Sequence, residues 1–296
     1  MAYLKLLRPK DWAKNLFLFI PSFFAGEIFN TPELWLLVGG FFSFSFLASS
    51  IYILNDYRDI EDDRKHPEKK HRPLASGAAK KSIAMGLCIA LLIAGTAIGI
   101  ALDSSLKYLF VLSIYYLLNL GYSFGLKNVS IVDILIVASG FVLRVKGGAI
   151  LADVHTTEWL IIMTFLLALF MAIAKRRDDV LLKVNTGMDM RKAVKGYTLD
   201  FLNVMLGLVC AIIIVSYINY SVSGQLYQKY GHRLYYTALF VIAGIMRYLQ
   251  ITFVLNSSGS PTKILYKDRF IQATIVLWII SFYVILYLKD ITVFDK

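Results

Sequence analysis

The chain has 296 residues, of which 58% are hydrophobic and 14% aromatic, and its mean hydropathy is +0.64. Soluble domains are usually about 45–50% apolar, so this composition excludes an ordinary soluble globule and indicates a membrane protein. The formal charge of +11 is typical of basic membrane-flanking loops, anionic lipid contacts or phosphorylated substrates, and we expect no nucleic acid partner.

Nine apolar runs are long enough to cross about 30 Å of hydrocarbon, which takes roughly 17–25 residues. We expect one all-α integral membrane domain over residues 1–296, with a cytoplasmic polar loop after its second helix (55–81) and its sixth helix (175–200). The predicted spans are residues 14–29, 34–54, 82–102, 106–125, 130–151, 158–174, 201–220, 235–255 and 270–288. Pro21 makes the first span the weakest. Cys88 and Cys210 lie inside apolar runs and have no disulfide or metal spacing.

Lysine and arginine predict the orientation. If the N-terminus is cytoplasmic, 23 of the 31 basic residues lie on the inner side, 5 on the outer side and 3 within spans. This asymmetry follows the positive-inside rule. We therefore expect a multi-pass protein of the cell (inner or plasma) membrane, with its N-terminus and active site in the cytoplasm. No cleavable signal peptide is predicted, because the apolar segment after Met1–Lys14 leads into further spans.

The second predicted span runs into the most acidic stretch of the chain, with five acids in positions 56–63. If the helix continues, Asn55, Asp59 and Asp63 recur at four-residue spacing on one face, with Asp56 beside them. Clustered oxygen ligands favour a hard cation, and Mg²⁺ completes its coordination with water and substrate phosphate oxygens. An isolated acidic run is more often a solvated face. The nearby bases, Arg64 and Arg72 among them, favour a metal–diphosphate site instead.

Charges within the predicted spans are a second signal. Arg144 and Lys146 lie in an apolar helix, where a charge usually faces a cavity or a partner. For Arg144 a functional role is favoured, whereas for Lys146 snorkelling to the interface is equally consistent. Lys14 follows Trp12 at the first membrane boundary, where interfacial anchoring and phosphate contact compete. The role of Arg247 stays open.

The pattern Asn55-Asp56-x-x-Asp59-x-x-x-Asp63, followed by residues 72–77 (Arg-Pro-Leu-Ala-Ser-Gly), resembles the first aspartate-rich motif of the UbiA superfamily of intramembrane prenyltransferases. Typical members carry a second Asp-x-x-x-Asp motif after helix six, whereas this chain reads Lys-Arg-Arg-Asp-Asp at 175–179. The chain looks more like the decaprenyl-phosphate phosphoribosyltransferase branch. The stretches that resemble this branch are residues 8–15, 62–67, 122–127 and 139–144, Gly147-Gly148, and Lys175-Arg176-x-x-Asp179.

This resemblance implies a Mg²⁺-dependent transfer of the 5-phosphoribosyl group from phosphoribosyl diphosphate to a polyprenyl phosphate, with release of diphosphate. The implied metal ligands are Asn55, Asp56, Asp59 and Asp63, and the three aspartates are the implied catalytic residues. The implied substrate-binding residues are Lys14, Arg64, Arg72, Tyr122, Lys127, Arg144, Lys175, Arg176 and Asp179. The acceptor phosphate is already anionic, so no general base is assigned to His66 or His71.

Two alternatives stay open. An ordinary UbiA prenyltransferase would move a prenyl group from a prenyl diphosphate to an aromatic or quinone precursor, and the missing second motif argues against it. A transporter or cation-binding protein would more naturally place acids at mid-depth than at the edge of a span. Asp178 and Asp179 could hold a second metal, orient ribose hydroxyls, or pair with Arg176 and Arg177.

Overall fold

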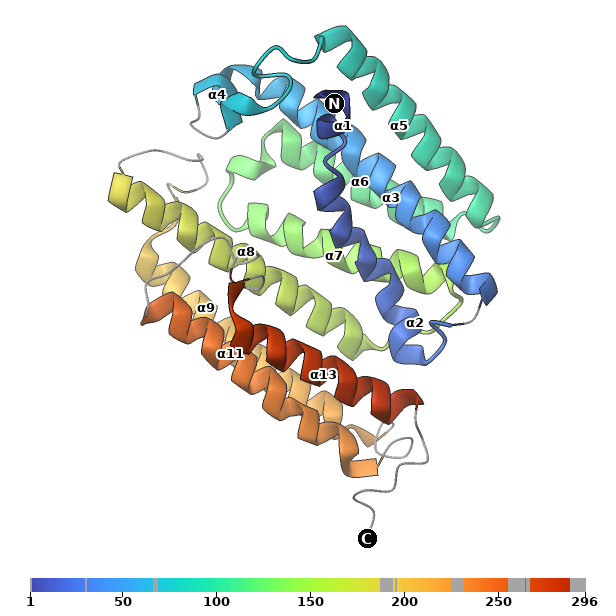
Figure 1. The fold of residues 1–296 in the computed structure, drawn as a ribbon, viewed down its shortest axis with the longest axis vertical. Helices are drawn as coiled ribbons and strands as arrows, with labels where there is room; N and C mark the ends of the chain where they lie inside the picture. Colours follow the sequence, from blue (N-terminus) through green and yellow to red (C-terminus); the bar gives the residue numbers. More distant parts are fainter. Residues whose placement is uncertain are drawn as a thin grey trace. The chain divides into compact units, whose positions relative to one another are not determined.

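The computed structural model describes residues 2–29, 31–65, 69–186, 194, 196–224, 231–254, 264 and 267–287. Every regular element in these ranges is a helix, which confirms the all-α prediction (Figure 1). The chain forms two compact units. The first comprises Met1–Lys127 and Ser139–Thr156, and the second comprises Asn128–Ala138 and Thr157–Lys296.

The described elements are α-helices and 3-10 helices. The α-helices are α1 (Ala2–Leu6), α2 (Ile20–Ala25), α3 (Thr31–Arg58), α4 (Ile60–Lys65), α5 (Lys81–Leu102), α6 (Lys107–Phe124), α7 (Val132–Leu151), α8 (Glu158–Thr186), α9 (Leu199–Ser221), α11 (Ala238–Phe253) and α13 (Arg269–Tyr287). The 3-10 helices are η1 (Pro9–Phe19), η2 (Lys69–His71), η3 (Leu126–Asn128) and η5 (Gly231–Thr237).

Six helical segments in the described part of the chain are long and apolar enough to cross a membrane. They are Pro32–Arg58, Lys81–Leu102, Val132–Leu151, Glu158–Val184, Leu199–Ser221 and Arg233–Phe253. These segments correspond to six of the nine predicted spans. A shorter apolar segment, Arg269–Ile285, corresponds to the last prediction. The number nine stays a prediction.

The first predicted span, residues 14–29, is not one continuous helix. Its first part belongs to η1, a 3-10 helix of 11 residues, and α2 then ends at Gly26, whose φ of 85° is left-handed. A 3-10 helix has three residues per turn, so Trp12, Asn15 and Leu18 form one row along η1. This row packs on α3 and α7, because Trp12 and Asn15 donate hydrogen bonds to serines of α3 and Leu18 meets Gly148 of α7.

The sequence predicted a polar loop at 175–200, and this prediction places the start of the loop too early. Helix α8 continues to Thr186, so Lys175, Arg176 and Asp179 lie on a helix and not in a loop. The helix tolerates these charges because Arg176 pairs with Asp179 one turn later and with Asp133 of α7. Most of the remaining predicted loop, residues 187–193 and 195, lies outside the described residues.

Helices α3 and α5 lie side by side in the first unit (Figure 1). Gly95 of α5 permits this approach, because a Cβ there would lie 2.1 Å from a methyl of Leu47 and 3.0 Å from the carbonyl oxygen of Ser43. The Ser43 hydroxyl donates to the Gly95 carbonyl at 2.7 Å. Small residues and hydroxyl hydrogen bonds are the usual means of packing helices in a membrane. The contact fixes α3, whose last turn carries Asn55 and Asp56, the start of the acidic motif.

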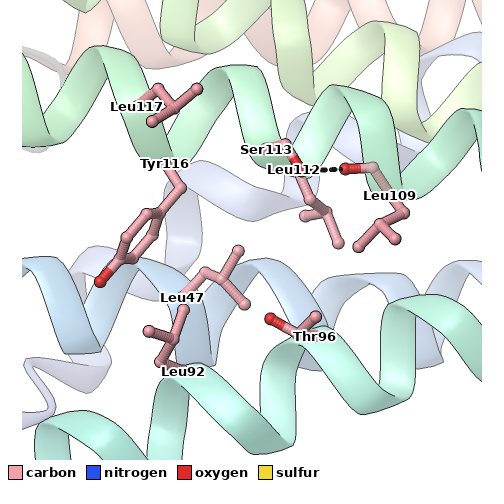
Figure 2. Close-up of a pocket in the computed structure, with 8 residues that line it drawn as sticks. All are labelled: Leu47, Leu92, Thr96, Leu109, Leu112, Ser113, Tyr116 and Leu117. Carbon is pink, nitrogen blue, oxygen red and sulfur yellow. Dashed lines mark hydrogen bonds between the residues drawn. The ribbon is translucent and has the colours of Figure 1, made fainter.

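A cavity of about 310 Å³ lies between α3, α5 and α6 (Figure 2). Its walls are Leu47, Leu92, Thr96, Leu109, Leu112, Ser113, Tyr116 and Leu117. The Ser113 hydroxyl donates to the Leu109 carbonyl of its own helix at 2.8 Å, so it has no need of a ligand. None of the lining residues is charged. The cavity therefore offers no cation to a phosphate group.

The second unit has a core of its own, built from α8, α9, α11 and α13 with the start of α7. The most deeply buried members of this core are Ile173, Leu202, Leu206 and Ile213. Asp268 connects two of its helices. The carboxylate accepts from Arg247 of α11 at 2.8 Å and from the first turn of α13 through the backbone N–H of Ile271 at 3.0 Å. This ion pair gives Arg247 a structural role, which the sequence left open.

Candidate active site

The helical register continues across the junction between α3 and α4. The backbone N–H of Asp59 donates to the Asn55 carbonyl at 3.0 Å, and that of Asp63 donates to the Asp59 carbonyl at 2.7 Å. Both are bonds from residue i to residue i−4, as in an uninterrupted α-helix. The spacing of Asn55, Asp59 and Asp63 therefore keeps its expected register, with Asp56 one residue along.

Asp56 and Asp63 share one arginine. Nη1 of Arg72 lies 3.0 Å from Oδ1 of Asp56 and 2.8 Å from Oδ2 of Asp63. Both carboxylates are almost fully buried, with 3% and 4% of their side chains exposed. Arg8 supplies a second cation, 2.5 Å from the same oxygen of Asp56. Buried carboxylates need such compensation, because an unpaired buried charge is strongly destabilising.

The segment after Arg72 holds its guanidinium against the acids. Leu74 and Ala75 are buried, and Leu74 packs in a cluster with Leu6 and Ile60. The backbone N–H of Ser76 donates to the Arg72 carbonyl at 2.9 Å. Gly77 adopts φ +78°, a left-handed conformation that glycine takes without strain. The sequence Arg-Pro-Leu-Ala-Ser-Gly thus forms a folded turn that positions Arg72.

Asn55 and Asp59 share a lysine. Nζ of Lys127, from η3, lies 3.1 Å from Oδ1 of Asn55 and 2.8 and 2.6 Å from the two oxygens of Asp59. The Asn55 amide also donates to Oδ2 of Asp59 at 3.0 Å. The structure therefore brings together six predicted site residues from segments far apart in the sequence, namely Asn55, Asp56, Asp59, Asp63, Arg72 and Lys127.

Arg8 was not predicted as a site residue. Its φ of 50° and ψ of 59° are left-handed, which is uncommon for a residue with a bulky side chain. In this conformation its guanidinium reaches Asp56 and lies 4.9 Å from the centre of the Tyr52 ring. The available sequence signal was its position before Pro9, since proline restricts the backbone of the preceding residue.

Of the other predicted substrate-binding residues in the first unit, Arg64 and Lys14 make their ion pairs with different acids. Arg64 pairs with exposed Glu61 at 2.9 Å and donates to the Ala75 carbonyl at 3.1 Å, so it supports the turn. Tyr122 lies half-buried in the last turn of α6. Lys14 pairs with Asp11 of its own helix at 2.6 Å.

Arg144 is buried in the middle of the Val132–Leu151 span, with 4% of its surface exposed. Its Nε donates to Asn15 at 2.7 Å, Nη1 to the Gly140 carbonyl at 2.7 Å, and Nη2 to the Tyr115 hydroxyl at 2.9 Å. Among the described residues, none of its acceptors is a carboxylate. Its positive charge is thus held by neutral groups. Lys146, by contrast, is exposed and donates to Thr156 at 2.9 Å.

The second unit contains a separate buried ion cluster. Arg176 lies 2.5 Å from Asp133 and 2.5 Å from Asp179, and the Tyr197 hydroxyl donates to Asp133 at 2.7 Å. Burial raises the pKa of Tyr197 to about 12, so it stays a neutral donor. Asp133 and Tyr197 were not predicted, and no motif in the sequence marked them. Lys175, just before this cluster, is exposed.

Asp178 and Asp179, which are adjacent in the sequence, do not form a metal site with a third ligand from the described residues. In the parts of the chain that the structure describes, no three His, Cys, Asp or Glu side chains gather closely enough to hold a metal. Asp179 is committed to Arg176. Arg177 donates to Asn203 at 2.7 Å and lies 5.1 Å from the Phe253 ring, so it packs within its own unit.

The oxygen groups at the end of α3 nevertheless suit Mg²⁺ in chemical type. Carboxylate and amide oxygens are its usual protein ligands. Here the Lys127 ammonium stands between Asn55 and Asp59, and Arg72 stands between Asp56 and Asp63. Each cationic group occupies a position between two oxygen donors. A divalent cation that binds here would take over such a position and release the basic side chain.

Known proteins are similar to this chain in sequence and in fold. The sequence model described as the UbiA prenyltransferase family matches residues 16–278. A decaprenyl-phosphate phosphoribosyltransferase of Corynebacterium glutamicum is 30% identical over 96% of this chain and 86% of its own length. The enzyme of that name from Mycolicibacterium smegmatis is 31% identical over 93% of this chain and 89% of its own. The predicted resemblance to this group is therefore confirmed.

Solved structures agree on the fold. A UbiA homolog from Archaeoglobus fulgidus bound to GPP and Mg²⁺ superposes with a TM-score of 0.71 at 21% identity, over 97% of this chain and 99% of that one. The same homolog bound to DMAPP and Mg²⁺ gives 0.70. At this identity the likeness establishes the helical architecture.

Proposed function

The chain belongs to the UbiA prenyltransferase family, and we propose that it moves the 5-phosphoribosyl group of phosphoribosyl diphosphate to a polyprenyl phosphate, with release of diphosphate. As a member of this family it is a membrane transferase. The observation that carries the proposal is the identity of about 30% with two decaprenyl-phosphate phosphoribosyltransferases, over 93–96% of the chain.

The charge of the site supports this reading. Three basic side chains, Arg8, Arg72 and Lys127, face the acids at the end of α3, and Arg144 is a further cation in the same unit. Donor and acceptor together would carry three phosphorylated groups, whereas joining a prenyl diphosphate to a neutral aromatic needs charge compensation at one end only. A surplus of cations therefore suits the phosphoribosyl reaction better.

The acids and the bases have complementary roles in this proposal. Asn55, Asp56, Asp59 and Asp63 would hold Mg²⁺, which neutralises the donor diphosphate and helps it to depart as a leaving group. Arg72 and Lys127, released from the carboxylates by the metal, would then donate to phosphate oxygens. These exchanges would keep the buried carboxylates at this site paired with a cation both before and after the substrate binds.

The transfer needs no proton acceptor in the protein. An oxygen of the acceptor phosphate forms a bond to the anomeric carbon of the ribose, and the bond from that carbon to the diphosphate oxygen breaks. The bonding electron pair leaves with the diphosphate. The acceptor oxygen is anionic at neutral pH, so His71 is not required as a base, and His66 lies outside the described residues.

In this proposal the protein lies in the inner or plasma membrane, and its active site faces the cytoplasm. The basic residues of the N-terminus and of the 55–81 segment favour that side. Phosphoribosyl diphosphate is soluble and highly charged, so it would reach the site from the aqueous phase. The acceptor would reach it from the lipid phase, with its phosphate at the interface.

A comparison of donors tests the proposal. Purified protein in lipid nanodiscs receives Mg²⁺ with labelled phosphoribosyl diphosphate and polyprenyl phosphate, or with a prenyl diphosphate and an aromatic acid. We expect label to enter the lipid only in the first mixture. Turnover only in the second mixture would establish the ordinary prenyltransferase, which the family description and the GPP-bound relative favour as the second candidate.

A further inference from the structure

We propose that Arg144 binds the 5-phosphate of the donor and thereby selects phosphoribosyl diphosphate over prenyl diphosphate, with Asn15 and Tyr115 as positioning residues. This inference rests on the proposed function and assigns the second anionic end of its donor. It derives from three features of the first unit: the charge of Arg144, its fixed orientation, and its depth in the membrane span.

The first feature is an uncompensated positive charge. An arginine has five N–H donors, and three of those in Arg144 bind neutral oxygens of Asn15, Gly140 and Tyr115. The guanidinium also lies 4.8, 5.5 and 5.8 Å from the ring centres of Tyr115, Phe141 and Phe44. Aromatic faces reduce the cost of burying a cation but supply no anion. Two N–H groups and the full charge remain for an anionic ligand.

The second feature is the rigid support of the guanidinium. Asn15 is 1% exposed, and its amide donates to the Ser45 hydroxyl at 2.8 Å while its carbonyl accepts from Arg144. One turn along α7 from Arg144, Gly148 lies against η1, where a Cβ would come within 1.9 Å of the Leu18 carbonyl oxygen. A buried side chain with its neighbours fixed in this way holds a specific orientation, as ligand recognition requires.

The third feature is depth. Phe44, which lies 5.8 Å from the guanidinium, precedes Asp56 by twelve residues of α3, and this separation corresponds to about 18 Å along the helix axis. Arg144 itself lies twelve residues into α7. One phosphate group cannot contact both the acidic motif and Arg144. A donor with a phosphate at each end of a ribose can, if it lies along α3.

Polar groups connect the two ends. Between the levels of Asp56 and Arg144, the Trp12 indole donates to the Ser49 hydroxyl at 3.0 Å, and the Tyr52 ring lies beside Arg8. A prenyl diphosphate would place hydrocarbon along this polar row and against a buried cation. The hydrocarbon end of a prenyl diphosphate carries no negative charge, so its binding would leave the Arg144 guanidinium unpaired and would be disfavoured. Arg144 would therefore discriminate between the two donors.

A phosphate monoester could come from either substrate, since the acceptor also ends in one. The depth favours the donor. A lipid phosphate stays with the headgroups at the membrane surface, at the level of the last turn of α3, and Arg144 lies far below that level. The experiment must therefore measure the two substrates separately.

The test compares Arg144→Met with the wild type, using phosphoribosyl diphosphate and its analogue ribose 1-diphosphate, which lacks the 5-phosphate. We expect Arg144→Met to raise KM for phosphoribosyl diphosphate by about 10- to 100-fold, the range for a lost hydrogen bond to a charged group. KM for ribose 1-diphosphate and for polyprenyl phosphate should be unchanged. Lys146→Met, two residues along on the exposed side, is the matched control and should behave as the wild type.

Two further measurements separate the possible results. Tyr115→Phe removes one positioning contact and should raise KM for phosphoribosyl diphosphate by a smaller factor, with kcat unchanged. Ribose 5-phosphate should bind the wild type and not Arg144→Met in calorimetry, whether or not turnover occurs.

Three outcomes would overturn the assignment. They are a rise of KM for polyprenyl phosphate alone, an equal loss with both diphosphates, and binding of ribose 5-phosphate that Arg144→Met leaves intact. A wild type that binds ribose 5-phosphate through Arg144 but transfers no phosphoribosyl group would contradict the proposed function and leave the phosphate site standing.

Discussion

At the scale of single residues, the candidate site is a set of oxygen side chains bridged by basic ones. Lys127 joins Asn55 to Asp59, and Arg72 joins Asp56 to Asp63. Each bridge satisfies the charges of the protein without substrate. In the proposed function the same bridges would open on binding of a metal and a diphosphate, so that binding would exchange one set of ion pairs for another. This exchange makes the acids testable one at a time.

Asp59→Asn should abolish Mg²⁺-dependent turnover, with a loss of at least about 100-fold, as for removal of one group that stabilises developing charge. The amide keeps the size of the carboxylate but removes the charge that both Lys127 and a divalent cation need. The measurement is initial rate against Mg²⁺ concentration, with thermal unfolding to verify the fold. Asp62→Asn, an exposed neighbour in α4, should leave the rate unchanged. Equal rates for the Asp59 variant and wild type would remove Asp59 from the metal site.

At the scale of elements, the position of η1 decides where Arg144 points. Gly148→Ala should destabilise the protein by about 1–3 kcal/mol, because its Cβ would meet the Leu18 backbone and not a flexible side chain. Thermal unfolding in detergent measures this change. Gly86→Ala in α5 is the control: a Cβ there meets nothing within 4 Å, so stability should be equal or slightly higher. A similar loss of stability in both variants would show that the contact between η1 and α7 does not account for the effect of Gly148→Ala.

The stability that the Asp268–Arg247 ion pair contributes should be lost at acid pH. The hydrogen bond from Arg247 holds the pKa of Asp268 below its ordinary value. A carboxyl with a lowered folded-state pKa adds stability above its unfolded pKa of about 3.9, and that contribution disappears as pH falls through the folded value. The difference in melting temperature between wild type and Asp268→Asn should thus be largest near neutral pH and shrink below about pH 4. A constant difference from pH 7 to pH 3 would contradict this role.

At the scale of the whole molecule, local patterns in the sequence predicted the helices and their register well. Contacts between residues far apart in the sequence were not predicted. Apolar length located six segments that can span a membrane, and four-residue spacing placed Asn55, Asp59 and Asp63 in one register. Arg8 and Asp133 escaped notice because their partners, Asp56 and Arg176, lie 48 and 43 residues away. Charge density also misled, since it predicted a loop where α8 continues: paired charges can stay in a helix.

The two compact units raise the question of whether the chain acts as one domain. The match to the UbiA prenyltransferase family runs from residue 16 to residue 278 and therefore includes both units. We propose that they form one functional domain over residues 1–296.

The orientation of the molecule in its membrane can be tested with cysteines. Cys88 and Cys210 are both buried, so the wild type should react little with a membrane-impermeant maleimide. Helix α5 has 22 residues, or about 33 Å, so its two ends lie on opposite sides of a bilayer. From the positive-inside rule we expect the end near Lys81 in the cytoplasm and the end near Leu102 outside.

Ser104→Cys, exposed after the end of α5, should therefore be labelled in intact cells. Asp62→Cys, exposed in α4 beside the acidic motif, should be labelled only after the membrane is opened. Turnover of each variant shows that it is folded, because neither residue contacts the bridged acids in the described structure. Labelling of Asp62→Cys in intact cells would show that the topology is the inverse of the predicted one. It would also place the proposed site on the side of the membrane that a cytoplasmic phosphoribosyl donor does not reach.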